Sequence, residues 1–126
     1  MKRLMTPTEM RRRLCAGERA IDLVIEKWER ILAWVRAGKV PCENDIMDTS
    51  CAFCELYIES NCTKCHIARA SGRIGCQGTP WEDVASALRN ALDPLSPVAA
   101  ELSFLKAVRR GHGRDWLVKH VYRDER

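Results

Sequence analysis

Apolar residues recur every seven positions over the first third of the 126-residue chain. They form two interleaved rows, which are Leu14, Ile21, Trp28 and Val35, and Met10, Gly17, Val24 and Ile31. A heptad repeat of this kind predicts an amphipathic helix with one apolar seam. Thr6 and Pro7 supply the cap and the first helical position, and Glu9 stands at the capping-box position. Because Gly38 is placed to end the helix, the pattern predicts one long helix over residues 7–37.

The apolar seam of this helix has two possible uses. It can pack against later helices of the same chain, or it can offer a coiled-coil-like surface to another protein or to a second copy. Gly17 lies on the seam, where the missing side chain lets another backbone approach closely. The sequence leaves both uses open.

The last third of the chain predicts further helices. Residues 79–82, Thr-Pro-Trp-Glu, repeat the N-terminal cap pattern and predict a helix over residues 80–92. Asp-Pro at 93–94 ends this helix, and a second one follows from Ser96 to Gly111, with a short third helix after it. Trp81 is expected to cover the metal lobe. The fold class is therefore all-α or nearly so, with two to three C-terminal helices packed on the long helix.

Length and composition indicate a single domain over residues 1–126. The chain is 46% apolar and 30% charged, and no Gly/Ser-rich or Pro-rich linker divides it. Its parts are the helix region 1–39, a metal-binding lobe 40–79 and the C-terminal helices 80–126. Only 6% of the residues are aromatic, so a metal that cross-links the chain would help a core of this size.

The central lobe is rich in cysteine. Seven cysteines occur in the chain, and the predicted metal ligands are two CxxC pairs, Cys51 with Cys54 and Cys62 with Cys65. Each CxxC turn places two thiolates on one ion, so the pairs together suit a tetrahedral zinc site. Seven residues separate the pairs, fewer than the 12 or more usual in zinc ribbons. Cys76 is the substitute ligand, and His66 is a sixth candidate for the same shell.

Other cofactors compete for these cysteines. An iron–sulfur cluster also takes four thiolates, and the sequence leaves an iron–sulfur or thiol redox protein open as an alternative. Residues 62–66 spell CxxCH, the haem-attachment string, but they occur without an export signal and beside another CxxC, so we set haem aside. No βαβ pattern surrounds either pair, which argues against a thioredoxin-like site.

The N-terminal sequence bears on location and charge. The start, MKRLMTPTEMRRRLC, lacks the apolar core of a signal peptide, and no run approaches the roughly 20 apolar residues of a membrane span, so we expect a cytoplasmic protein. Residues 1–39 carry ten Lys/Arg against five Asp/Glu. This surplus is compatible with nucleic acid. In that alternative the phosphate contacts come from Arg11, Arg12, Arg13, Arg19, Arg109, Arg110 and Arg114.

The strings CAFCELY, CTKCH and GCQGTPW, followed by ELSFL, carry a resemblance. Over residues 51–105 the chain resembles a group of small uncharacterised proteins from phages, prophages and archaea. The resemblance implies a Cys-rich metal site in which Cys76 joins the two CxxC pairs, a mobile-element context and therefore a host cytoplasm. It implies no activity. The group often has Pro where this chain has His66, so the resemblance assigns that residue no role.

No catalytic constellation emerges from the sequence. It has no serine nucleophile elbow, no HExxH, and no HxE followed by PCxxC. Four thiolates on one zinc also leave no open position for a substrate. We therefore predict a non-enzymatic, zinc-stabilised binding module that contacts a protein through the seam of residues 7–37, such as a phage-encoded modulator of a host complex. The alternative is a zinc-stabilised, nucleic-acid-binding regulator.

Overall fold

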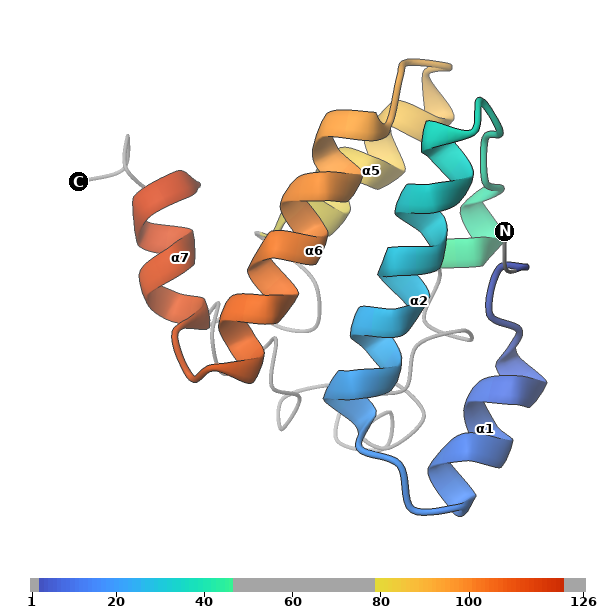
Figure 1. Cartoon of the computed structure of the whole chain (residues 1–126). Coiled ribbons are helices and arrows are strands. Elements are labelled where there is room, and N and C mark those ends of the chain that lie inside the picture. Colours follow the sequence, from blue (N-terminus) through green and yellow to red (C-terminus); the bar gives the residue numbers. More distant parts are fainter. Residues whose placement is uncertain (1–2, 47–78, 122–126) are drawn as a thin grey trace.

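The computed structural model describes residues 3–46 and 79–121 (Figure 1). This part of the chain contains helices and no strand: α1 (Pro7–Cys15), α2 (Ala20–Arg36), the short 3₁₀ helix η1 (Glu43–Ile46), α5 (Pro80–Arg89), α6 (Leu95–Arg109) and α7 (Gly113–His120). The predicted all-α class is therefore confirmed for residues 3–46 and 79–121. The predicted metal lobe falls largely on residues 47–78, outside the described residues.

The prediction of one long N-terminal helix is wrong, because the chain turns back after Cys15. Helices α1 and α2 lie side by side as an antiparallel pair (Figure 1). Gly17 has a φ of 96°, and the N–H groups of Gly17 and Glu18 donate to the carbonyls of Leu14 and Arg13 at 3.0 and 3.1 Å. This is the Schellman end of a helix, which favours glycine at the left-handed position. The seam glycine therefore ends α1.

The predicted helix starts are confirmed. The hydroxyl of Thr6 accepts a hydrogen bond from the Glu9 N–H at 3.1 Å, and that of Thr79 accepts one from the Trp81 N–H at 3.4 Å. A side chain that caps the first turn in this way satisfies one of its unpaired N–H groups. Helix α6 starts at Leu95, one residue earlier than predicted, where the Asp93 carboxylate accepts from the Leu95 N–H at 3.0 Å.

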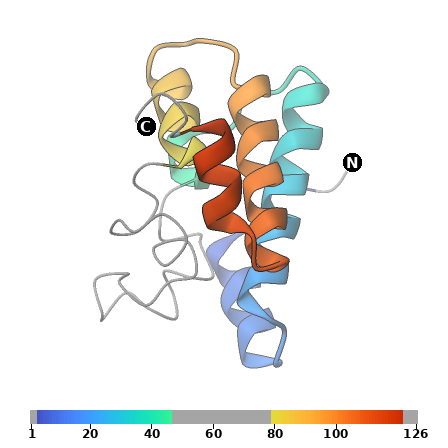
Figure 2. The same cartoon turned by 90° about the vertical axis from the view of Figure 1, so that its left-hand side faces the viewer.

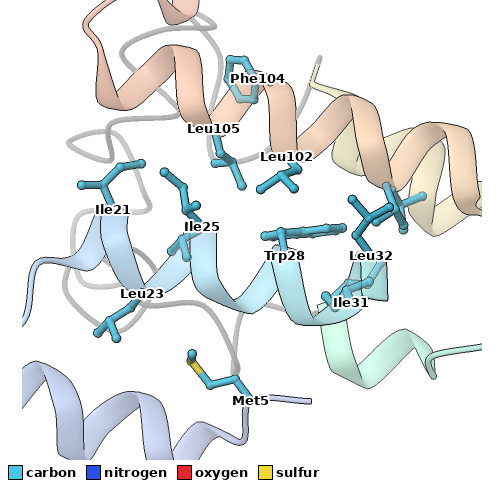
Figure 3. Close-up of a cluster of buried hydrophobic side chains, with 14 of the residues drawn as sticks. Met5, Ile21, Leu23, Ile25, Trp28, Ile31, Leu32, Leu102, Phe104 and Leu105 are labelled. Atoms are coloured by element: carbon cyan, nitrogen blue, oxygen red, sulfur yellow. The ribbon is translucent and has the colours of Figure 1, made fainter. Parts of the chain in front are cut away.

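The core lies between α2 and α6. Figure 3 shows Ile21, Ile25 and Trp28 of α2 pointing toward Leu102 and Leu105 of α6. The two helices are antiparallel, since α6 ends where α2 begins (Figure 1). Helices α5 and α7 pack on α6, and α1 packs on α2. Of the C-terminal helices, α6 is thus the one that packs extensively along α2.

The seam residues of α2 are part of this core. Ile21, Val24, Trp28 and Ile31 are each at most 3% exposed, and Met10 of α1 is 2% exposed. Burial of such side chains removes them from water and contributes roughly 1.5–3 kcal/mol for each large one. These five seam positions are therefore buried inside this chain, and contact with a partner through the seam stays a prediction.

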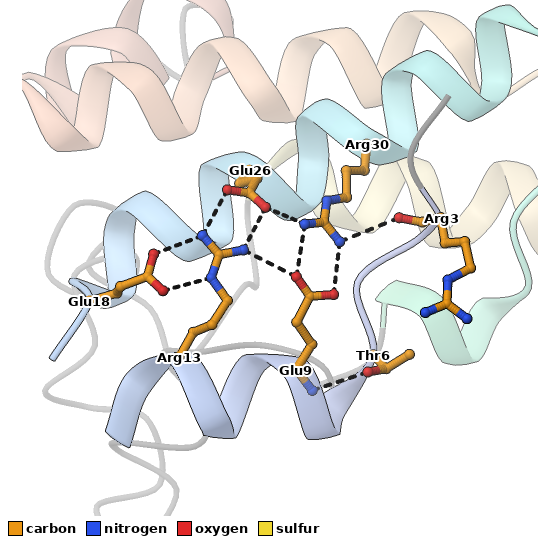
Figure 4. A network of polar contacts seen from close by, with 7 residues as sticks. All are labelled: Arg3, Thr6, Glu9, Arg13, Glu18, Glu26 and Arg30. Atoms are coloured by element: carbon orange, nitrogen blue, oxygen red, sulfur yellow. Dashed lines mark hydrogen bonds and ion pairs between the residues drawn. The ribbon is translucent and has the colours of Figure 1, made fainter. Parts of the chain in front are cut away.

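An ion network joins α1 to α2 (Figure 4). The Arg13 guanidinium donates to Glu26 at 2.6 Å and to Glu18 at 2.7 Å, and the Arg30 guanidinium donates to Glu9 at 2.8 Å and also to Glu26. Each guanidinium therefore bridges the two helices. The second half of the predicted capping box does not form here, because the Glu9 carboxylate binds these two arginines.

The arginines shift the titration of the carboxylates they bind. Hydrogen bonds from Arg13 hold the pKa of Glu26 at about 2, and the hydrogen bond from Arg30 lowers the pKa of Glu9. A lowered pKa in the folded state means that the ionised carboxylate stabilises the fold above its unfolded pKa of about 4.5. This stabilisation is lost as pH falls from about 4.5 toward about 2.

We expect Glu26→Gln to lower the free energy of unfolding by roughly 1–2 kcal/mol at pH 7, because it removes an ionised acceptor from two partly buried guanidinium groups. Urea denaturation followed by circular dichroism measures the loss. The difference from wild type should shrink as pH is lowered through the range from 4.5 to 2. Glu29→Gln is the matched control, since Glu29 is exposed on the same helix. An equal loss in the control, or no loss at Glu26, would contradict the role of the network.

Candidate functional site

The structure leaves the predicted metal ligands untested. All six candidates lie outside the described residues: Cys51, Cys54, Cys62, Cys65, His66 and Cys76. The two cysteines that the structure does describe, Cys15 and Cys42, are exposed and form no disulfide. Within residues 3–46 and 79–121, no group of three or more His, Cys, Asp or Glu side chains is arranged to hold a metal ion. The metal site therefore stays a prediction for the cysteine segment.

The helices fix both ends of that segment at one place. Helix α5 packs against η1, so the residue before the segment, Ile46, lies near the residues that follow it. The Trp81 indole Nε1–H donates a hydrogen bond of 2.7 Å to the Ile46 carbonyl. Ile46 and Thr79 are 2% and 3% exposed. The described residues on either side of the cysteine segment thus lie at one place, where Trp81 binds Ile46.

A tight turn precedes this anchor. The Asp45 N–H donates to the Cys42 carbonyl at 2.9 Å, and the Asp45 carboxylate accepts from the Cys42 N–H at 2.8 Å. An Asp that bonds to nearby backbone in this way stabilises a turn. Cys42 therefore starts the turn that forms η1. Trp81 is half-buried at the anchor. The prediction that it covers the metal lobe concerns residues outside the described ones, so it stays a prediction.

Most of the predicted phosphate-binding arginines gather at one end of the helical bundle. Helices α1 and α6 end there, and α2 and α7 begin there (Figures 1 and 2). Arg109, in the last turn of α6, contacts the Asp22 carboxylate in the first turn of α2 at 3.4 Å. We define the arginine end as the exposed residues Arg11, Arg12, Arg19, Arg109, Arg110 and Arg114.

Arg13 does not belong to this exposed set. It is the third arginine of the run at 11–13, and its side chain lies against α2 within the ion network (Figure 4). Successive residues of a helix point about 100° apart, so three adjacent arginines cannot all face the same surface. The prediction of Arg13 as a phosphate contact is therefore not supported by its position, because Glu18 and Glu26 occupy its donors.

Sequence reasoning missed two buried charged residues. Lys27 of α2 is 2% exposed and Glu101 of α6 is 1% exposed, although both are charged types that are rarely buried unless paired. Each of them takes part in an interaction. The signal was available, since Glu101 stands three residues after Val98 and four before Leu105, on the apolar face of its helix.

No protein family, curated protein or solved structure matches this chain. Among the helices that the structure describes, none has the length and apolar character required to cross a bilayer.

We expect Trp81→Phe to loosen the anchor, because it keeps an aromatic ring at this position but removes the donor to the Ile46 carbonyl. Leaving that carbonyl without its partner should lower the free energy of unfolding by about 1 kcal/mol, measured by urea denaturation. Trp34→Phe is the matched control, since Trp34 is also half-buried but contacts the Lys39 ammonium through its ring face at 4.4 Å. Equal losses in the two variants would show that ring size, and not the hydrogen bond, matters.

Proposed function

We propose that this chain is a non-enzymatic binding module in which a zinc ion cross-links the cysteine segment on a helical scaffold. The ligands we assign are the four thiolates of the two CxxC pairs: Cys51, Cys54, Cys62 and Cys65. The observation that carries the proposal is the anchor between Trp81 and Ile46, at 2.7 Å, which brings the two ends of the segment together. A cysteine-rich segment whose two ends meet at one place is suited to form a lobe that a metal ion stabilises.

The donor set fits a structural zinc ion. Four thiolates satisfy the tetrahedral preference of zinc and leave no coordination position for a substrate or a water molecule. Zinc bound in this way supplies folding energy, about 10–16 kcal/mol in small zinc peptides near neutral pH. Cys76 is the substitute if one of the four is not a ligand. These properties support a binding module rather than a hydrolase.

The helical scaffold supports this division of roles. Its core contains Phe104, Leu105 and Leu117, each fully buried, and α5, α2 and α7 all pack on α6. These buried residues belong to helices that pack on one another, so the described helices share an apolar core. The metal is then needed to order the cysteine segment, which presents its surface to a partner from a rigid base.

Metal analysis of protein purified without added metal tests the proposal. We expect one zinc ion per chain and no visible absorption band. Cys54→Ser and Cys65→Ser should each reduce the bound zinc, because each removes one thiolate from the shell. Cys15→Ser is the matched control, since Cys15 is exposed on α1, and it should leave the zinc content unchanged.

Two results would overturn this assignment. Iron with a charge-transfer band would replace zinc by an iron–sulfur cluster and point to redox or sensing. Protein without any metal would remove the basis of the proposed cross-link. The Cys76→Ser variant resolves the remaining choice, because it should lose zinc only if Cys76 belongs to the shell.

A further inference from the structure

The heptad spacing of the seam continues through the turn between α1 and α2. Met10 and Leu14 of α1 lie seven residues before Gly17 and Ile21, and the same spacing runs on along α2. The turn that joins the two helices occupies only residues 16–19. The seam is therefore in register for two arrangements of the same residues: the antiparallel pair in Figure 1, or one helix that runs straight through the turn.

The backbone of the turn already pairs the groups that a continuous helix would pair. The Gly17 N–H bonds to the Leu14 carbonyl at 3.0 Å, and the next N–H bonds to the Arg13 carbonyl at 3.1 Å. In a continuous helix the same two N–H groups would bond to the same two carbonyls in the opposite pairing. The φ of Gly17, which is 96°, would become negative. Gly17 is therefore the residue that favours the reversed form.

A continuous helix would also satisfy the N–H groups at the start of α2. The N-cap residue Arg19 gives no side-chain cap, and the Leu23 N–H bonds to the Arg19 carbonyl at 3.1 Å. The N–H groups of residues 20–22 therefore have no partner within α2. If the helix continued, they would bond to the carbonyls of residues 16–18.

The contacts that hold α1 on α2 can equally come from the α1 of a second copy. Among the residues of α1, Met10 is buried. Arg13 of α1 binds Glu26 of α2 at 2.6 Å. Arg30 of α2 binds Glu9 of α1 at 2.8 Å (Figure 4). None of these contacts requires that both helices belong to the same chain.

We propose that two copies of this chain form a dimer by exchanging α1. In the dimer the turn is straightened, residues 7–36 form one helix, and each α1 packs on the α2 of the partner copy. Exchange of an identical element keeps the contacts of the monomer and changes only the hinge, and a short hinge favours it. This inference goes beyond the proposed function and does not depend on the metal, because only residues 7–36 rearrange.

Gly17→Ala tests the hinge. A Cβ at Gly17 would meet no atom within 4 Å, so the substitution acts through the backbone preference alone. Alanine disfavours the left-handed turn and favours a helix, each by roughly fivefold, and the dimer has two hinges. We expect the dissociation constant of the dimer, measured by sedimentation velocity on the full chain, to fall at least about 100-fold. Gly38→Ala is the matched control, because Gly38 has a φ of 83° and equally free space but lies beyond the seam.

A second substitution should reverse the effect. Added to Gly17→Ala, Arg19→Pro should return the chain to a monomer. Arg19 has a φ of −72° in the antiparallel pair, which proline adopts without strain. Inside a continuous helix, proline removes a backbone hydrogen bond and clashes with the preceding turn.

A mixing experiment identifies the exchanged contact. Arg13→Glu and Glu26→Arg each place like charges across α1 and α2 within one chain, where the wild type has an ion pair. In a mixed dimer the two variants complement each other only if the α1 of each chain lies on the α2 of the other. We expect native mass spectrometry to show heterodimers in the mixture and far weaker dimerisation of each variant alone.

Three results would overturn the inference: a Gly17→Ala chain that is folded by circular dichroism but monomeric at every concentration, equal dimerisation of the Gly38→Ala control, or a mixture without heterodimers. Zinc-loaded protein whose dimer dissociates on chelation would also contradict this inference alone, because it would point to a metal shared between chains. Metal-free protein that dimerises through α1 would contradict the proposed function alone.

Discussion

The packing of α6 against α2 is the constraint on which the rest of the structure depends. Trp28 of α2 lies against Leu102 and Leu105 of α6, and α5 and α7 take their places by packing on the other faces of α6 (Figure 3). Because the two helices are antiparallel, the end of α6 lies beside the start of α2. One apolar contact thus also determines where the arginines of both helices meet.

The ion network performs a second positioning task. It ties α1 to α2 through guanidinium groups that bridge the helices, with Arg30 reaching Glu9 and Arg13 reaching Glu26 (Figure 4). Exposed ion pairs contribute little to stability one at a time, but these guanidinium groups are partly buried and share their acceptors. By turning Arg13 inward, the network leaves Arg11 and Arg12 on the outer side of α1.

Local signals in the sequence predicted most of the helices. Caps such as Thr6 and Thr79 act through a hydrogen bond within one turn, so they can be read without knowledge of the fold. The heptad pattern did not reveal the reversal at Gly17. Two helices that fold back on each other can keep the same spacing of apolar residues along the sequence as one continuous helix. A glycine on a seam is equally compatible with close packing and with a helix end.

For the candidate site, the sequence indicated the residue types but not their arrangement in space. The residue types that could bind phosphate were evident, but their meeting at one end depends on the antiparallel packing of α6 on α2, a long-range contact. Arg13 points into the ion network because it binds Glu26, which is thirteen residues away along the chain and on the other side of the turn. The anchor between Trp81 and Ile46 joins residues 35 positions apart, so no local motif indicated it.

The most direct test is hydrogen exchange of the full chain, measured before and after bound metal is removed with a chelator. It shows whether a metal orders the cysteine segment, and whether the helical scaffold stays folded without that metal. The account predicts faster exchange after chelation in the segment and at its anchor, η1 and the start of α5, with α2 and α6 still protected. Exchange that is unchanged throughout the chain would contradict the metal cross-link. Loss of protection in α2 and α6 would contradict an independent helical core.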